Sequence, residues 1–293
     1  MNAPTVASTA SLADEVLYPS YSRMGEALIT HAKLKPEDVE RILTLQQESH
    51  LLFGEAAIQL GLIKEADLKK VLSAQFDYAY FDEGSHLNAA LVAAHQPFSE
   101  QVEHLRSLRG QLLIRWFDAG HKTLAVTSTE ANDGADRVAA NLAIVFSQLN
   151  KKTLLIDANL RQPSQHTLFN IDTRVGLANI LANRQGNYQL ARHESLPHLS
   201  ILTAGTAVPN PQELLSKSSF TELLADLENV YDIIIIESAP MAMGADYLTV
   251  VAKAKAAIVV TRQDHTMANS LQTLITQLNM TGAHVIGTVI QDF

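Results

Sequence analysis

Four consecutive isoleucines, Ile233–Ile236, place the strongest constraint on how this 293-residue chain can fold. A run of β-branched residues without polar alternation is typical of a strand buried on both faces. From residue 121 onward, such runs alternate with helical segments, which predicts an α/β domain whose parallel sheet has helices on both faces. The strands are expected at Thr123–Thr127, Thr153–Asp157, Leu199–Leu202, Asp232–Ile236, Ala257–Thr261 and Val285–Val289, and helices at Glu100–Trp116, Arg137–Asn150, Phe220–Asn229 and Ser270–Met280.

The composition narrows the range of functions. Hydrophobic residues make up 47% of the chain and the formal net charge is −9, which fits a globular protein with no general attraction for nucleic acid. The chain has 0 cysteines, so disulfides and thiolate metal sites are excluded. No apolar run approaches the roughly 18 residues of a membrane span, and Met1–Asp14 lack the pattern of a signal peptide. A cytoplasmic protein is expected.

An internal repeat occupies the N-terminal part. Residues 23–46 and 52–75 align at one constant offset, which pairs Gly25 with Gly54 and Gln46 with Gln75. Each unit is expected to form two short helices that pack against those of the other unit, giving a small helical domain over residues 20–82. Residues 1–19 are expected to be a disordered tail, and 83–99 a linker with a short helix near Ala89–Ala94.

By spacing alone, this repeat is equally compatible with a helical adaptor that binds no ligand. However, its pattern of Arg23-Met24-Gly25, the matching Leu52-Phe53-Gly54, and spaced leucines ending in glutamine resembles the N-terminal domain of type II secretion and pilus ATPases. Members of that family bind cyclic di-GMP. An arginine can bind a phosphate or a guanine edge with two hydrogen bonds, and leucines can contact the purines. The resemblance implies a cyclic di-GMP site at Arg23, Gly25, Gln46, Gly54, Gly61 and Gln75.

Three strand ends of the α/β domain carry polar residues that should meet at one edge of the sheet. The first strand leads into Thr129–Arg137 and then into a helix, the second ends at Asp157 and Arg161, and the third ends at Glu237. Upstream, Glu103, Arg106 and Arg109 fall on one helical face. The simplest interpretation of such a trio is a solvated charged surface.

Together, these segments over residues 100–293 resemble the bacterial tyrosine kinases of exopolysaccharide operons, whose nucleotide site is a deviant P-loop. Gly205 and the run Pro209–Leu215 match a further motif of that family. The resemblance implies self-association through the Glu103 trio, a membrane polysaccharide co-polymerase as partner, and a position peripheral to the inner membrane. It implies a Mg-ATP or ADP site with Asp157 and Glu237 on Mg²⁺, and a nucleotide loop of Asp133, Gly134, Ala135, Asp136 and Arg161.

The loop departs from a working P-loop at its key positions. Ala135 stands where a lysine would contact the β- and γ-phosphates, and Asp136 stands where a Ser or Thr hydroxyl would bind Mg²⁺. A like charge about 4 Å away costs roughly 4 kcal/mol at an effective dielectric constant of about 20. Repulsion of ATP is therefore expected. The last tyrosine of the chain is Tyr247, so the C-terminal tyrosine cluster that these kinases phosphorylate is missing.

Three functions are compatible with this sequence. The first is a regulatory pseudokinase of exopolysaccharide biosynthesis that senses cyclic di-GMP. The second is a still active kinase or ATPase in which Asp157 and Glu237 hold Mg²⁺ and either Arg161 or a basic residue of a partner faces the phosphates. The third is a partitioning ATPase, which the Glu103 trio and the Pro209–Leu215 segment disfavour.

Overall fold

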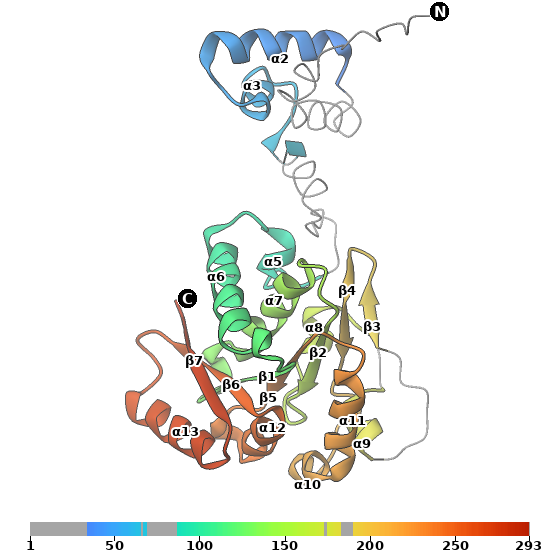
Figure 1. Ribbon diagram of the computed structural model, residues 1–293, viewed down its shortest axis with the longest axis vertical. Helices are drawn as coiled ribbons and strands as arrows, with labels where there is room; N and C mark the ends of the chain where they lie inside the picture. The colour runs from blue at the N-terminus through green and yellow to red at the C-terminus, as the bar shows by residue number, and fades with distance from the viewer. Residues whose placement is uncertain (1–33, 66, 69–86, 173–174, 183–189, 293) are drawn as a thin grey trace, which may run out of the picture. The chain divides into compact units, whose positions relative to one another are not determined.

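The computed structural model describes residues 34–65, 67–68, 87–172, 175–182 and 190–292 (Figure 1). The chain divides into two compact units, Met1–Tyr78 and Ala79–Phe293. Among the described helices, none is long and apolar enough to cross a membrane.

The first unit contains the helices α2 (Pro36–Ser49) and α3 (Phe53–Gln59). The internal repeat is visible in how its helices begin. The Lys35 N–H donates to the Asp38 carboxylate at 3.1 Å, and the Lys64 N–H donates to the Asp67 carboxylate at 3.0 Å. Lys35 and Lys64 hold equivalent positions of the repeat, so both units start their second helix with the same cap. The core of this unit consists of Leu34, Ile42, Phe53, Ala56, Ala57 and Ile63.

The second unit is built on a seven-stranded sheet in the order β3-β4-β2-β5-β1-β6-β7. Every neighbouring pair is parallel except β3 and β4, which are antiparallel. The strands are β1 (Thr123–Ser128), β2 (Thr153–Ala158), β3 (Ala191–His193), β4 (Leu196–Leu202), β5 (Ile233–Ser238), β6 (Ala256–Arg262) and β7 (His284–Gln291). The predicted fold class is confirmed, and so are the six predicted strands.

Helices cover both faces of this sheet (Figure 1). Because side chains alternate along a strand, Ile233 and Ile235 pack in one apolar core with α5, α6 and α7, and Ile234 and Ile236 pack in the other core with α11 and α12. The helices are α5 (Val92–His95), α6 (Glu100–Arg115), α7 (Ala135–Ser147), α8 (Gln165–Leu168), α9 (Leu177–Leu181), α10 (Pro211–Ser216), α11 (Ser218–Glu228), α12 (Asp246–Ala254) and α13 (Ala268–Met280), with 3₁₀ turns η1 (Phe117–Ala119), η2 (Ala131–Asp133) and η3 (Met241–Met243).

The segment 83–99, expected as a linker, is part of the second unit from residue 87 onward. Leu91, Ala93 and Ala94 are fully buried in the core beneath α6 and α7. The buried amide of Asn141 on α7 holds this segment, since it accepts from the Ala93 N–H at 2.9 Å and donates to the Ala90 carbonyl at 2.8 Å. The second unit therefore begins before the first expected helix.

Candidate nucleotide site and its buried carboxylates

The candidate site lies where β1, β2 and β5 end. Asp157 and Glu237 are direct neighbours in the register of β2 and β5, and Val126 of β1 lies on the other side of Glu237. Strands that run parallel bring their carboxyl ends to one edge, so segments more than 70 residues apart in sequence meet here. The strand register therefore brings together Asp157, Glu237 and the 129–137 loop, as the sequence predicted.

The loop after β1 is held by Asp133, whose side chain is fully buried. One carboxylate oxygen accepts from the Thr129 hydroxyl at 2.7 Å and from the Glu130 N–H at 2.9 Å, and the other accepts from the Thr266 hydroxyl at 2.9 Å. Gly134 follows at φ +84°, a conformation that favours glycine, and α7 begins at Ala135. Asp133 thus fixes the loop from inside, and its carboxylate is turned away from solvent.

A cavity of about 320 Å³ lies beside the first turn of α7. Among the described residues that line it, none is Lys or Arg, and Asp136 and Glu237 are acidic. The helix N-terminus supplies partial positive charge, but Asp136 stands on its first turn and opposes it. This donor set does not fit a Mg-triphosphate, because it lacks the cationic groups that offset phosphate charge.

Asp157 and Glu237 are nearly inaccessible to solvent, with exposed fractions of 0% and 2%. Asp157 accepts backbone N–H bonds from Asn159, Ser164 and Gln165 at 3.1–3.2 Å. Both of its oxygens are used in this way, so its role is to order the loop between β2 and α8.

The side-chain amide of Gln165 links Glu237 to α7. Its Nε2 donates to Glu237 Oε2 at 2.6 Å and to the Asp136 carbonyl at 3.1 Å. The Ser164 hydroxyl approaches the same carboxylate at 3.3 Å. Among the described atoms, the buried Oε1 of Gln165 has no hydrogen-bond partner. A neutral amide therefore bridges the strand end and the first helical turn of the loop.

Burial raises the pKa of Asp157 to about 7, against the opposing effect of its three backbone hydrogen bonds. Burial, followed by the charge of Asp157, raises the pKa of Glu237 well above its ordinary value. Both groups hold protons more tightly in the folded protein than in the unfolded chain. A positively charged group nearby would lower these two pKa values. Among the described side chains that line the cavity, none is positively charged.

Arg161 is directed to another partner. Its guanidinium makes two hydrogen bonds, at 2.6 and 3.0 Å, to the carboxylate of Asp246, which is fully buried in the first turn of α12. It also packs over Gly244, where a Cβ atom would lie 3.2 Å from the guanidinium. In this arrangement Arg161 ties the loop after β2 to α12, and it is absent from the cavity lining.

The two arginines of the trio on α6 are turned toward the protein itself, whereas Glu103 is exposed. Arg106 bonds to Glu103, and its side chain is only 11% exposed. Arg109 donates to the Val145 carbonyl of α7 at 2.5 Å. Glu103 is the most exposed of the three, with 61% of its side chain accessible.

The residues expected to bind cyclic di-GMP are only partly described. Arg23, Gly25 and Gln75 lie outside the described residues. Gly54 is buried, and a Cβ atom there would lie 2.7 Å from the Leu68 methyl groups, so its missing side chain makes room for Leu68. Gly61 has φ +68°, a left-handed conformation that favours glycine, and is exposed. Gln46 is half-buried and makes a contact of its own.

Comparison with known proteins identifies the lineage of the α/β unit. The tyrosine-protein kinase YwqD of Bacillus subtilis is 36% identical over 165 residues, which cover 56% of this chain and 70% of YwqD. The chain belongs to the bacterial tyrosine-protein kinase family. It spans 86% of the putative tyrosine-protein kinase CapB of Staphylococcus aureus but 26% of EpsB of Ralstonia solanacearum. No family model matches the chain.

Solved structures agree with this assignment. The kinase domain of the Escherichia coli tyrosine kinase ETK superimposes with a TM-score of 0.66 at 25% identity, covering 73% of this chain and 89% of that domain. At the level of the fold alone, the septum site-determining protein MinD of Pyrococcus horikoshii, solved with Mg-ADP, has a TM-score of 0.50 at 18% identity and covers 58% of this chain and 70% of MinD.

Three residues of this site carry no signal in the sequence. Ser164, Gln165 and Asp246 are common polar types, and they gain their roles only through the fold, which brings Gln165 to Glu237 and Asp246 to Arg161. The Pro163 that precedes Ser164 marks a turn but does not reveal what the turn contacts.

Replacing Asp133 tests whether its carboxylate holds the loop. Asp133→Ala leaves the Glu130 N–H, the buried Thr129 hydroxyl and the half-buried Thr266 hydroxyl without their acceptor, so it should lower the free energy of unfolding by about 1–3 kcal/mol. Urea denaturation followed by the fluorescence of Trp116, the 1 tryptophan of the chain, measures this. Asp133→Asn, which keeps one acceptor oxygen, should lose less. Equal stability of Asp133→Ala and the wild type would contradict this role.

Replacing Glu237 tests the pKa shift. The folded protein keeps a proton that the unfolded chain releases, so this contribution to stability is present at low pH and is lost as the pH rises toward 7 and above. Glu237→Gln removes the ionisable group. The change that this substitution makes in the free energy of unfolding should be more favourable at pH 8 than at pH 5 by about 1 kcal/mol or more.

The measurement is urea denaturation at the two pH values. The exposed Glu222→Gln on α11 is the matched control and should show no such difference. An equal effect of Glu237→Gln at both pH values would mean that Glu237 titrates normally.

Proposed function

We propose that this protein is a regulatory pseudokinase of exopolysaccharide biosynthesis. The observation that carries the proposal is the cavity beside α7, whose described lining offers Asp136 and Glu237 and no Lys or Arg. Phosphoryl transfer depends on cations that neutralise the charge on the transferred group. Membership of the bacterial tyrosine-protein kinase family supports descent from a kinase. The resemblance to kinases of exopolysaccharide operons supports a role in exopolysaccharide biosynthesis.

The alternative is an active kinase or ATPase with an unusual loop. It draws support from the surviving pair of acids, Asp157 and Glu237, and from the fold that the chain shares with MinD, which was solved with Mg-ADP. In this alternative, a basic residue of a partner would provide the missing positive charge, because Arg161 is engaged with Asp246.

A second part of the proposal concerns the N-terminal unit, which we assign to cyclic di-GMP sensing. The equivalent caps at Lys35 and Lys64 support the repeat that resembles cyclic di-GMP-binding domains. Leu43 and Leu52 expose 40% and 68% of their surface, which leaves apolar area for purine bases. The signal would pass to a membrane polysaccharide co-polymerase, with the protein at the cytoplasmic side of the inner membrane and self-associating through α6.

Nucleotide binding distinguishes the two functions. Calorimetric titration of the full chain with Mg-ATP should give no heat of binding up to about millimolar concentration. The double variant Ala135→Lys, Asp136→Ser adds a cation and removes an anion at the first turn of α7, so it should bind measurably better.

The control is Glu222→Lys, which makes the same change in net charge on an exposed helix and should bind no better than the wild type. Micromolar binding of Mg-ATP by the wild type would replace the pseudokinase with the active kinase. No gain in the double variant would mean that the site has changed beyond these two positions.

Arg23 is the test residue for the N-terminal unit. Arg23→Ala should weaken cyclic di-GMP binding by about tenfold or more, because a charge-assisted bond to phosphate is lost. Calorimetry with cyclic di-GMP measures it. Arg41→Ala, which removes an exposed arginine of α2 paired with Asp38 at 3.7 Å, should bind as the wild type does. Unchanged binding by Arg23→Ala would remove Arg23 from the site, and absent binding by the wild type would end the sensing proposal.

A further inference from the structure

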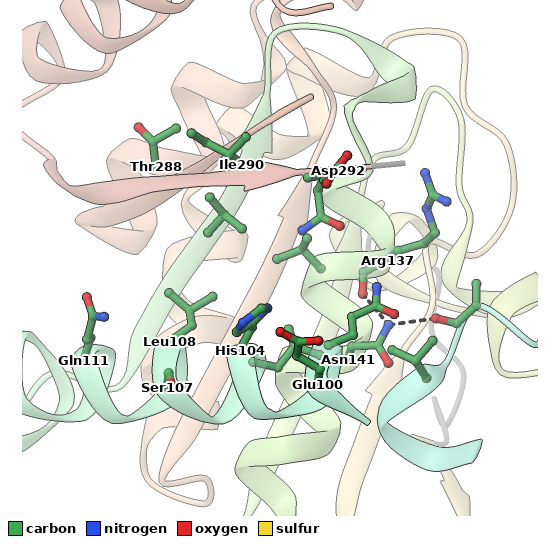
Figure 2. A pocket seen from close by; sticks show the side chains of 17 residues that line it. Glu100, His104, Ser107, Leu108, Gln111, Arg137, Asn141, Thr288, Ile290 and Asp292 are labelled. Atoms are coloured by element: carbon green, nitrogen blue, oxygen red, sulfur yellow. Dashed lines mark hydrogen bonds between the residues drawn. The ribbon is translucent and has the colours of Figure 1, made fainter. Parts of the chain in front are cut away.

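A groove separate from the nucleotide cavity runs between α6 and β7 (Figure 2). Its volume is about 920 Å³, and its floor and walls come from α6, the start of α7 and the last residues of β7. Figure 2 shows Glu100, His104 and Leu108 of α6 on one side and Thr288 and Ile290 of β7 on the other. Residues 288–292 line its whole strand side.

The strand side is the free edge of the sheet. Among the strands that the structure describes, β7 is the last in the order and pairs with β6 alone. The Gln291 carbonyl accepts from the Gln263 N–H at 2.8 Å, and the Val289 carbonyl accepts from the Thr261 hydroxyl at 3.3 Å, so the backbone groups of 289 and 291 face β6. Alternation then directs those of Thr288 and Ile290 toward the groove. Unpaired edge groups of this kind are a template for another strand.

Side chains along the groove determine which ligand groups it can bind. Leu108 of α6 and Val289 of β7, which both pack partly buried against the core beneath the groove, provide apolar surface. Glu100 and Asp292 lie at the same end of the groove in Figure 2. Arg137 of α7 also lines this end, and it already makes a contact of its own. The end of the groove is therefore suited to a cationic side chain, and its middle to an apolar one.

We propose that this groove binds an extended segment of another protein, which adds to the sheet as a strand beside β7. Main-chain hydrogen bonds to Thr288 and Ile290 supply affinity, as in other complexes formed by strand addition. An apolar side chain of the segment contacts Leu108, and a Lys or Arg beside it faces Glu100 and Asp292. Because α6 flanks the edge, a single extended chain fits, whereas edge-to-edge pairing of two copies would bring a second sheet against the helix.

The test selects phage-displayed random peptides of about ten residues, long enough to span the strand side at roughly 3.3 Å per residue. The full chain is the target. The tightest peptide, labelled with fluorescein, is then titrated by fluorescence anisotropy. Ile290→Pro removes the N–H that faces the groove and keeps the β6 side intact, so it should weaken binding by about tenfold or more. Ile290→Val, its matched control, should bind within about twofold of the wild type.

A second pair of variants tests the helix side independently. Ser107 is exposed and lines the groove, so Ser107→Trp should block it while Ser107→Ala should not. The intrinsic fluorescence of Trp116, read in the Ile290 variants, reports whether the fold is kept, and Ser107→Trp carries the test if Ile290→Pro does not fold. The nucleotide site plays no part in this proposal.

Three outcomes would overturn it. The first is a selection that yields no peptide binding the wild type. Selected peptides that bind Ile290→Pro and Ser107→Trp as tightly as the wild type would lie elsewhere on the surface. Sedimentation that finds a wild-type dimer abolished by Ile290→Pro would make a second copy of this chain the occupant of the edge.

Discussion

The parallel pairing of β2 with β5 is the constraint on which the α/β unit depends, because it sets Asp157 beside Glu237 in the interior. Two carboxylates so close and so buried are costly unless they are protonated or matched by positive charge. Three backbone N–H groups donate hydrogen bonds to Asp157, and the Gln165 amide and the Ser164 hydroxyl donate to Glu237. None of these groups carries a full charge, and the raised pKa values of both acids follow from that.

The substitutions in the loop form a consistent set. Ala135 and Asp136 remove positive charge at the start of α7, while Asp133 accepts three hydrogen bonds that keep the loop folded from within. A loop that becomes ordered only when it binds a phosphate would not need the Asp133 carboxylate as an internal hydrogen-bond acceptor. Arg161, a cation of the family pattern that this chain keeps, is paired with buried Asp246, where removing either partner would leave a charge without its match. Under the proposed pseudokinase function, these features would retain the fold while lowering the affinity for a polyanion.

The sequence predicted the parts of the structure that depend on periodicity, and missed those that depend on distant contacts. Ile233–Ile236 and the other apolar runs fixed six strands of the sheet, because burial on both faces leaves a direct compositional pattern. The short antiparallel β3 was not predicted, since it has only three residues, Ala191–His193. The contacts of Gln165 and Asp246 were beyond reach because each pairs residues more than 70 positions apart.

The same limit explains why the groove beside β7 has no counterpart in the sequence prediction. The strand at Val285–Val289 was expected, but only the strand order makes it an edge, and only the packing of α6 turns that edge into a groove. An exposed edge strand is a liability that folds usually cover, charge or shorten. Here β7 is eight residues long and carries the exposed Ile290, with its nearest charges at one end. An edge that long and that apolar is best explained by a strand that binds to it.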